Sequence, residues 1–130
     1  MSEAVAVLRR PLVAFLLDVL LVIVFAAAGR ASHDEANPVL GALLTAWPFL
    51  VGTVIGWVVV RLLRKSWPLE VGPGITVWFS TVLIGMALRQ ATGLGTAATF
   101  VLVAAAVLAL FLIGWRALVT LVLRRTRTSP

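Results

Sequence analysis

The sequence has no cysteine, no tyrosine, a single histidine and few charged residues. Without cysteine, a disulfide framework, a thiolate nucleophile and a cysteine metal site are all excluded. His33 stands beside Asp34 and Glu35, but a zinc site needs three or four suitable ligands, so we expect no metal and no cofactor. Only 12% of the 130 residues are charged, about half the usual share in a soluble domain, while 62% are apolar. This balance indicates a membrane protein.

The apolar residues are gathered in four long runs. Each run is long enough to cross the ~30 Å hydrocarbon core of a bilayer as a helix. We therefore predict an all-α fold, a polytopic transmembrane four-helix bundle, with residues 1–130 as a single integral membrane domain. The expected spans are about residues 12–29, 39–63, 75–91 and 96–123. The first run also resembles a signal peptide ending near Ala28, but it is long, contains Asp18 and precedes further spans, so we favour a span.

The basic residues lie at the ends of these runs rather than in one patch. Membrane orientation therefore explains the net charge of +6 better than nucleic-acid binding does. If the N-terminus is cytoplasmic, the other side carries only Arg30 and Arg89. The cytoplasmic side then carries nine basic residues, namely Arg9, Arg10, Arg61, Arg64, Lys65, Arg116, Arg124, Arg125 and Arg127. The positive-inside rule thus predicts a multi-pass protein of four spans with both termini in the cytoplasm.

Asp18 is the one polar residue in the apolar run 12–28. An acid near the centre of a spanning helix costs on the order of 2.5–3.5 kcal/mol on the insertion scale, so it should face protein or water and have a partner. Asp18 lies seven residues inside Pro11, and Arg116 lies seven residues before Leu123 at the end of the fourth run. At ~1.5 Å per residue, both reach a depth of about 10 Å from the same side. We infer an Asp18–Arg116 pair inside the bundle.

Two interpretations of this pair remain open. In the structural interpretation the two charges neutralise each other and fix the arrangement of the helices. In the functional interpretation the pair is part of a proton or ion relay. We favour the structural interpretation, because an arginine partner stabilises the carboxylate and makes proton uptake near neutral pH harder.

A second group of polar residues is expected at the outer rim. Arg30, His33 and Arg89 could together hold an anionic head group or a carboxylate. The alternative is that the two arginines extend to the interface, as arginines at helix ends usually do, while His33 is solvated. We favour this alternative.

The second run has the features of a packing helix. Gly52 and Gly56 form a GxxxG pair, on the same face as Gly41, Thr45 and Pro48. Small residues on one face let helices approach closely within lipid. Pro48 removes one helical hydrogen bond and favours a kink.

Several runs of sequence resemble one family. They are GRASHD (29–34), TAWPF (45–49), GMALRQATGLGTAATFVLVA (85–104) and GWR (114–116). These runs are similar to an uncharacterised family of four-span membrane proteins in actinobacteria and haloarchaea, a domain of unknown function. The resemblance implies a plasma-membrane location and a compact four-helix unit, and it brings no activity. In architecture alone, the chain also resembles small multidrug-resistance transporters, whose acid in the first span must be free, whereas here Arg116 can occupy Asp18.

Two functional hypotheses follow from these residues. The first is a small oligomeric transporter or channel component with an intramembrane Asp–Arg pair. The second is a non-transporting membrane module that binds a lipid, an apolar cofactor or a partner protein. We expect the lipid bilayer as partner, no nucleic acid, and leave a homo-oligomer open. We do not expect an enzyme, because the sequence has no Gly-x-Ser-x-Gly elbow and no phosphate loop. One exception is left open, an enzyme that acts on lipid at the outer leaflet through His33 and Asp34.

Overall fold

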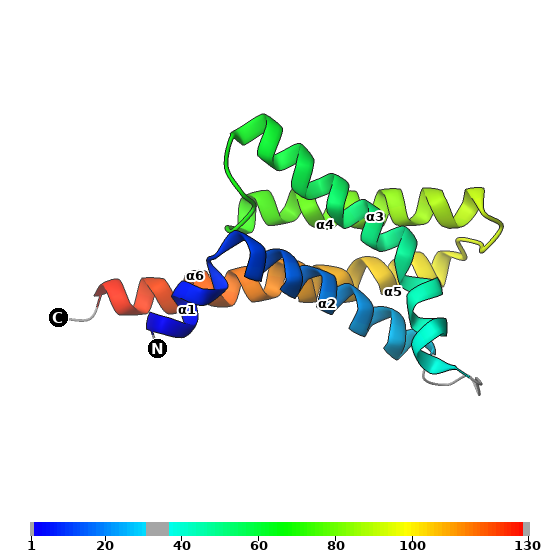
Figure 1. Cartoon of the computed structure of the whole chain (residues 1–130), viewed down its shortest axis with the longest axis horizontal. Helices are drawn as coiled ribbons and strands as arrows, with labels where there is room; N and C mark the ends of the chain where they lie inside the picture. Colours follow the sequence, from blue (N-terminus) through cyan, green and yellow to red (C-terminus); the bar gives the residue numbers. More distant parts are fainter. Residues whose placement is uncertain (1, 31–36, 129–130) are drawn as a thin grey trace.

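The structure is a computed structural model that describes residues 2–30 and 37–128, and every regular element in these ranges is a helix. Figure 1 shows their arrangement. In chain order the elements are α1 (Ser2–Leu8), α2 (Pro11–Arg30), α3 (Pro38–Arg64), α4 (Val71–Ala91), α5 (Ala98–Leu108), the π-helix η1 (Ala109–Ile113) and α6 (Gly114–Thr128).

Four helical stretches are long and apolar enough to cross a membrane, namely Pro11–Gly29, Pro38–Arg64, Val71–Ala91 and Ala98–Thr126. The last of these runs through α5, η1 and α6 as one continuous span. The all-helical fold with four such helices confirms the predicted fold class. Both termini and the α3–α4 connection lie at the same end of the bundle, which we call the terminal end (Figure 1).

Local sequence explains where α3 begins and ends. The Asn37 side chain accepts a hydrogen bond from the backbone N–H of Leu40, and Pro38 occupies the first turn, where a missing N–H costs nothing. At the other end Lys65 adopts a left-handed conformation with φ of 55°, and its N–H caps the carbonyl of Arg61.

The α4 helix begins earlier than the sequence suggested. The predicted third span starts at residue 75, after a stretch that contains Pro68, Gly72, Pro73 and Gly74, residue types that commonly interrupt a helix. Instead α4 starts at Val71 and includes three of them. Proline is compatible with a helical first turn, because the first N–H groups have no intrahelical acceptor. This shift places Gly74 inside the helix, where it meets Arg116.

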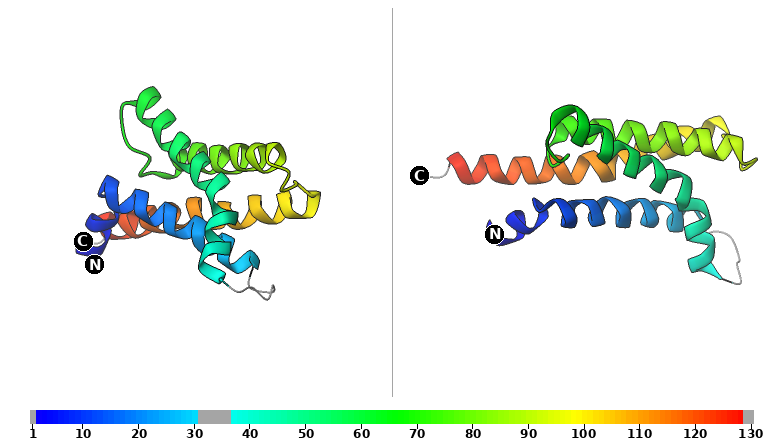
Figure 2. Two further views of the ribbon diagram at one scale, coloured as in Figure 1. Left: turned by 45° about the vertical axis from the view of Figure 1, so that its right-hand side comes forward. Right: turned by 45° about the horizontal axis from the view of Figure 1, so that its top comes forward.

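The α3 helix packs against both α4 and α2, and it crosses them at an angle (Figure 2). At Gly52 the approach to α4 is so close that an added Cβ would lie 2.6 Å from the carbonyl oxygen of Ser80 and 2.8 Å from Cα of Thr81. At Gly56 an added Cβ would lie 3.0 Å from Cα of Val77. The predicted glycine pair therefore lies at the contact between these two helices.

Pro48 lies inside α3, which changes direction within its first half (Figure 1). Proline has no N–H for the helical ladder and its ring crowds the preceding turn, which accounts for a bend. Beside this turn, Phe49 is fully buried and its ring lies against Gly85, where a Cβ would collide with it.

The interior consists of two apolar clusters. One contains Val22, Phe25, Phe49, Ala104, Leu108 and Leu112. The other contains Ala14, Trp57, Val60 and Val77 and lies toward the terminal end. Large apolar side chains also cover the outside; Leu12, Leu62, Leu102 and Leu110 are 68–71% exposed. Such an exterior suits lipid, because soluble proteins rarely expose large continuous apolar surface.

Candidate functional site

Asp18 and Arg116 form an ion pair in the interior. Arg116 Nη2 donates to Asp18 Oδ2 over 2.7 Å, and Nη1 donates to Oδ1 over 2.9 Å. This is the two-pronged geometry in which a guanidinium and a carboxylate fit best. Both side chains are 0% exposed. The two residues inferred from their depth and charge to be partners are therefore in direct contact, across α2 and α6.

Two tryptophans complete the surroundings of the carboxylate. Trp57 Nε1 donates to Oδ2 over 2.8 Å, and Trp115 Nε1 donates to Oδ1 over 2.9 Å. A carboxylate has about four lone-pair positions, and here four N–H groups from α3 and α6 point at them. Asp18 is therefore fully satisfied without water.

The hydrogen-bond donors of Arg116 are also all paired. Its Nε and Nη2 both donate to the carbonyl oxygen of Pro68, over 2.9 and 2.8 Å, and Nη1 also donates to the carbonyl of Leu112 over 2.7 Å. With the two bonds to Asp18, these account for the five N–H donors of a guanidinium. The arginine thus joins α2, the α3–α4 connection and its own helix.

Local backbone features make room for the arginine. Leu112 lies in the π-helix, whose wider turn pairs each N–H one residue further back than an α-helix does. Such turns disturb the regular ladder, and here the carbonyl of Leu112 accepts from the Arg116 side chain. On the opposite side Gly74 provides space, because a Cβ there would collide with Cδ of Arg116. Neither Leu112 nor Gly74 was singled out by the sequence patterns for this role.

The arrangement favours charge neutralisation over exchange. Burying each ion without a partner would cost several kcal/mol, and the geometry here offsets this cost by pairing every polar atom of both side chains. A relay would need a lone pair or a proton that can be released to another group. Each Asp18 oxygen instead accepts two hydrogen bonds from buried or half-buried donors.

Of the predicted rim residues Arg30, His33 and Arg89, only Arg89 has a described side chain, so the predicted group stays a prediction. His33 and Asp34 lie outside the described residues, and Arg30 is described only as the last residue of α2. Arg89 donates to the carbonyl oxygens of Gly95 and Leu94 over 3.1 and 3.2 Å. Its guanidinium also lies over the ring of Phe100, with Cζ 4.4 Å from the centroid. Arg89 therefore stabilises the α4–α5 connection through these hydrogen bonds.

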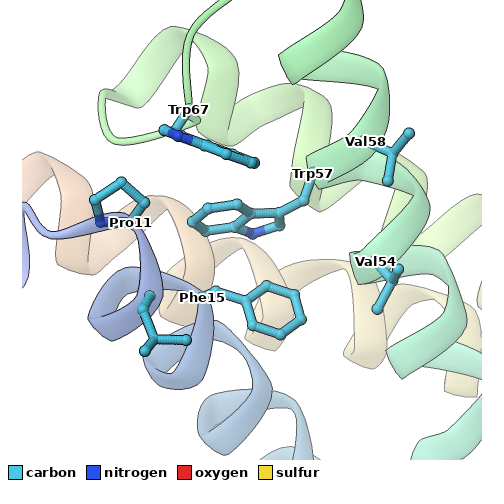
Figure 3. Close-up of a pocket in the computed structure, with 7 residues that line it drawn as sticks. Pro11, Phe15, Val54, Trp57, Val58 and Trp67 are labelled. Atoms are coloured by element: carbon cyan, nitrogen blue, oxygen red, sulfur yellow. The ribbon is translucent and has the colours of Figure 1, made fainter.

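An apolar groove lies on the outer surface beside the ion pair (Figure 3). It has a volume of about 430 Å³ and runs between the start of α2 and the second half of α3. Its lining consists of Pro11, Leu12, Phe15, Val54, Trp57, Val58 and Trp67.

Trp57 connects the groove to the ion pair. Its indole nitrogen is bonded to Asp18, while its ring lies between Phe15 and Trp67, at centroid distances of 5.3 and 6.0 Å (Figure 3). Judged by position along the chain, Trp57 lies in the middle of a span, where a tryptophan is expected to pack, while Trp67 and Trp115 lie near span ends, where tryptophans are typical of an interfacial belt. Trp115 instead donates to Asp18. The available signal was that an indole N–H within a span needs an acceptor, and the spans contain a single acid.

These features are those of a multi-pass helical membrane protein with a buried ion pair in its interior. The chain belongs to a family of proteins of unknown function, DUF3054, whose model matches residues 15–119. The match includes both Asp18 and Arg116. Comparison with the curated proteins gave no match, and comparison with the solved structures gave none either.

Proposed function

We propose that this protein is a non-transporting membrane module that holds the apolar chain of a membrane lipid in the groove between α2 and α3. The observation that carries this proposal is the groove itself, about 430 Å³ in volume and lined by apolar and aromatic side chains alone. Pockets of this size and character are typical of sites for small apolar ligands. We further propose that the protein resides in the plasma membrane, as the resemblance to four-span membrane proteins implies. The distribution of basic residues favours both termini in the cytoplasm, and we propose that the protein is not an enzyme.

The contacts of Asp18 support the non-transporting role. A transporter of the kind suggested by an acid in the first span needs that acid to exchange partners during its cycle. Asp18 and Arg116 are both 0% exposed, and their polar atoms are paired with each other, with two indoles and with two carbonyls. Opening this arrangement would leave a buried charge without its partner, at a cost of about 3–5 kcal/mol.

Flux measurements on the wild-type protein and Asp18→Asn in liposomes test the absence of transport. We expect proton, Na⁺ and K⁺ flux equal to that of empty liposomes in both cases, because the pair is closed. A flux in the wild-type protein that Asp18→Asn abolishes would overturn this part of the proposal.

Titration of delipidated protein in detergent with phospholipids brominated on the acyl chain tests the groove. Bromine quenches nearby tryptophans, and Trp57 and Trp67 line the groove. We expect saturable quenching in the wild-type protein and its loss in Val58→Phe, which fills the groove. Val103→Phe is the matched control, because Val103 is similarly exposed, 55% against 49%, but lies on α5 outside the groove. Equal quenching in both variants would contradict lipid binding at this place.

A further inference from the structure

We infer that the lipid bound in the groove is an anionic phospholipid, whose phosphate head group is held by Arg10 and Arg61. This inference rests on the proposed lipid-binding function and adds the chemical class of the ligand. It follows from how the cations are arranged around one end of the groove.

The groove has one apolar end and one end with basic residues. Figure 3 shows Val54 at one end and Pro11 with Trp67 at the other. Arg10 directly precedes Pro11 and is exposed. Arg61 lies one turn beyond Trp57 on α3, and its Cζ is 4.9 Å from the centroid of the Trp67 ring. Arg61 therefore lies at the end that is formed by Pro11 and Trp67, and the exposed Arg10 adjoins this end through its peptide bond to Pro11.

The length of the groove fits within the depth of one leaflet. Val54 and Arg61 are seven residues apart on α3, which corresponds to ~10 Å along the helix axis. One leaflet contributes about 15 Å of hydrocarbon. A lipid chain lying along Val54 and Val58 would therefore bring its phosphate to the level of Arg61. A tryptophan at this level, Trp67, suits the boundary between hydrocarbon and head groups.

The donors at this end have capacity left for a ligand. Arg61 uses Nη1 to donate to the carbonyl of Lys65, over 2.6 Å, and among the described residues its other guanidinium nitrogens have no protein acceptor. The Arg10 guanidinium and the Trp67 indole N–H likewise have no acceptor in the described ranges. Arg9, in contrast, is paired with Glu70 over 3.5 Å. An arginine with unused donors is well suited to a phosphate, which it can bind with two parallel hydrogen bonds.

The wall of the groove is also fixed in advance. Trp57 cannot rotate away without losing its bond to Asp18, and Phe15 packs edge-on against it at an interplanar angle of 85°. A preformed wall lowers the ordering cost of binding. A groove that merely collects any lipid would not need cations at one end of a rigid aromatic wall.

The test compares brominated phosphatidylglycerol with brominated phosphatidylcholine of identical chains, titrated into the delipidated full-length protein in detergent. Each basic residue near an anionic head group contributes about a fivefold increase in affinity. We therefore expect the anionic lipid to bind at least about fivefold more tightly. Arg10→Gln and Arg61→Gln should each reduce this preference by about that factor. Arg64→Gln is the matched control, because Arg64 lies on the same helix but its guanidinium is beside Gly72.

Each outcome has a distinct meaning. Equal binding of the two lipids, with loss of both in Val58→Phe, would overturn the head-group inference and leave the proposed lipid-binding function intact. The same preference in wild-type, Arg10→Gln and Arg61→Gln would also overturn it. No saturable quenching by either lipid would remove the proposed function and the inference together. If the wild-type protein is a dimer in detergent, and if Val58→Phe alone among these variants makes it a monomer, the groove is occupied by a second copy of the chain and not by a lipid.

Discussion

At the scale of single residues, the carboxylate of Asp18 is stabilised within an apolar helix because each of its oxygens accepts two hydrogen bonds. Four N–H groups from Arg116, Trp57 and Trp115 point at the two oxygens of Asp18. A buried charge of this kind is tolerated when its partner is close and the remaining lone pairs are hydrogen-bonded. The two indoles therefore matter for stability as well as the arginine.

The Trp57→Phe variant should be destabilised. It leaves one lone pair of a buried carboxylate without a donor, and hydrogen bonds to charged groups are worth about 1.5–3 kcal/mol. Trp47→Phe is the matched control, because Trp47 is on the same helix, is 37% exposed and makes no side-chain hydrogen bond within the described residues. We expect the control to change the unfolding free energy in detergent by no more than about 0.5 kcal/mol. Similar losses in the two variants would contradict the role of the Trp57 bond.

The sequence was sufficient to predict the Asp18–Arg116 pair, but not the two tryptophans that donate hydrogen bonds to it. Depth and charge were enough to join Asp18 to Arg116, because an acid and a base at one level of an apolar bundle have few other partners. The direction of an indole N–H depends on the rotation of its helix, which the pattern along the chain does not determine. Trp115 illustrates this, since its position near the end of a span is equally typical of the interfacial belt.

At the scale of the elements, α3 and α4 approach each other through glycine. Backbone atoms of Ser80 and Thr81 fill the space that a side chain at Gly52 would need. Polar contacts accompany this approach. The Ser80 hydroxyl donates to the carbonyl of Gly52 over 2.7 Å, and Thr53 and Thr81 share a hydrogen bond of 2.9 Å. Close backbone contact and interhelical hydrogen bonds are the main sources of helix association in lipid.

Gly52→Ala should therefore loosen this helix pair. The added methyl group meets backbone atoms that cannot move out of its way, and overpacking of this kind costs about 1–3 kcal/mol. Gly29→Ala is the control, since nothing lies within 4 Å of a Cβ there. Alanine should instead stabilise α2 by up to about 1 kcal/mol through helix propensity. Thermal unfolding in detergent measures both, and a Gly52→Ala protein as stable as the wild type would contradict the close approach.

The ends of elements were harder to predict than the elements themselves. The apolar runs indicated α2 and α3 to within a few residues, because proline and charge mark where they begin and end. At Gly72 and Pro73 the same signals failed, since both residues are compatible with the first turn of α4. The π-helix at Ala109–Ile113 carries no sequence signature among its apolar residues, so its place before Arg116 was not predictable.

At the scale of the whole molecule, the exposed apolar exterior and the four long helices describe a compact unit for the bilayer. The distribution of basic residues predicts which end of this unit faces the cytoplasm. Because the chain has no cysteine, single cysteines introduced by substitution can report it without interference.

We expect Leu94→Cys, in the α4–α5 connection, to react with a membrane-impermeant maleimide added to intact cells. Ser2→Cys at the terminal end should react only after the cells are opened, because eight basic residues outside the span interior, Arg116 being buried within it, favour that side as cytoplasmic. Val103→Cys, within a span, is the control for background labelling and should react poorly in both conditions. Labelling of Ser2→Cys in intact cells would reverse the orientation.

The groove beside the pair was beyond sequence reasoning. The groove depends on the angle at which α3 crosses α2. It also depends on the contact between Trp57 and Trp67, which lies in the α3–α4 connection. The apolar runs predict that helices pack, but crossing angles follow from the detailed shapes of their contacting faces. The number and class of helices were therefore predictable, and the pocket that supports the proposed function was not.

The most direct test of this account is a double-mutant cycle on Asp18→Asn, Arg116→Gln and the combined variant, measured as unfolding free energies in detergent. Each single variant leaves a buried polar group without its partner and should lose about 3–5 kcal/mol. The combined variant should lose roughly 2–3 kcal/mol less than the sum of the two. Small, additive losses would contradict the account, because Asp18 would then be independent of Arg116 and free to take part in transport.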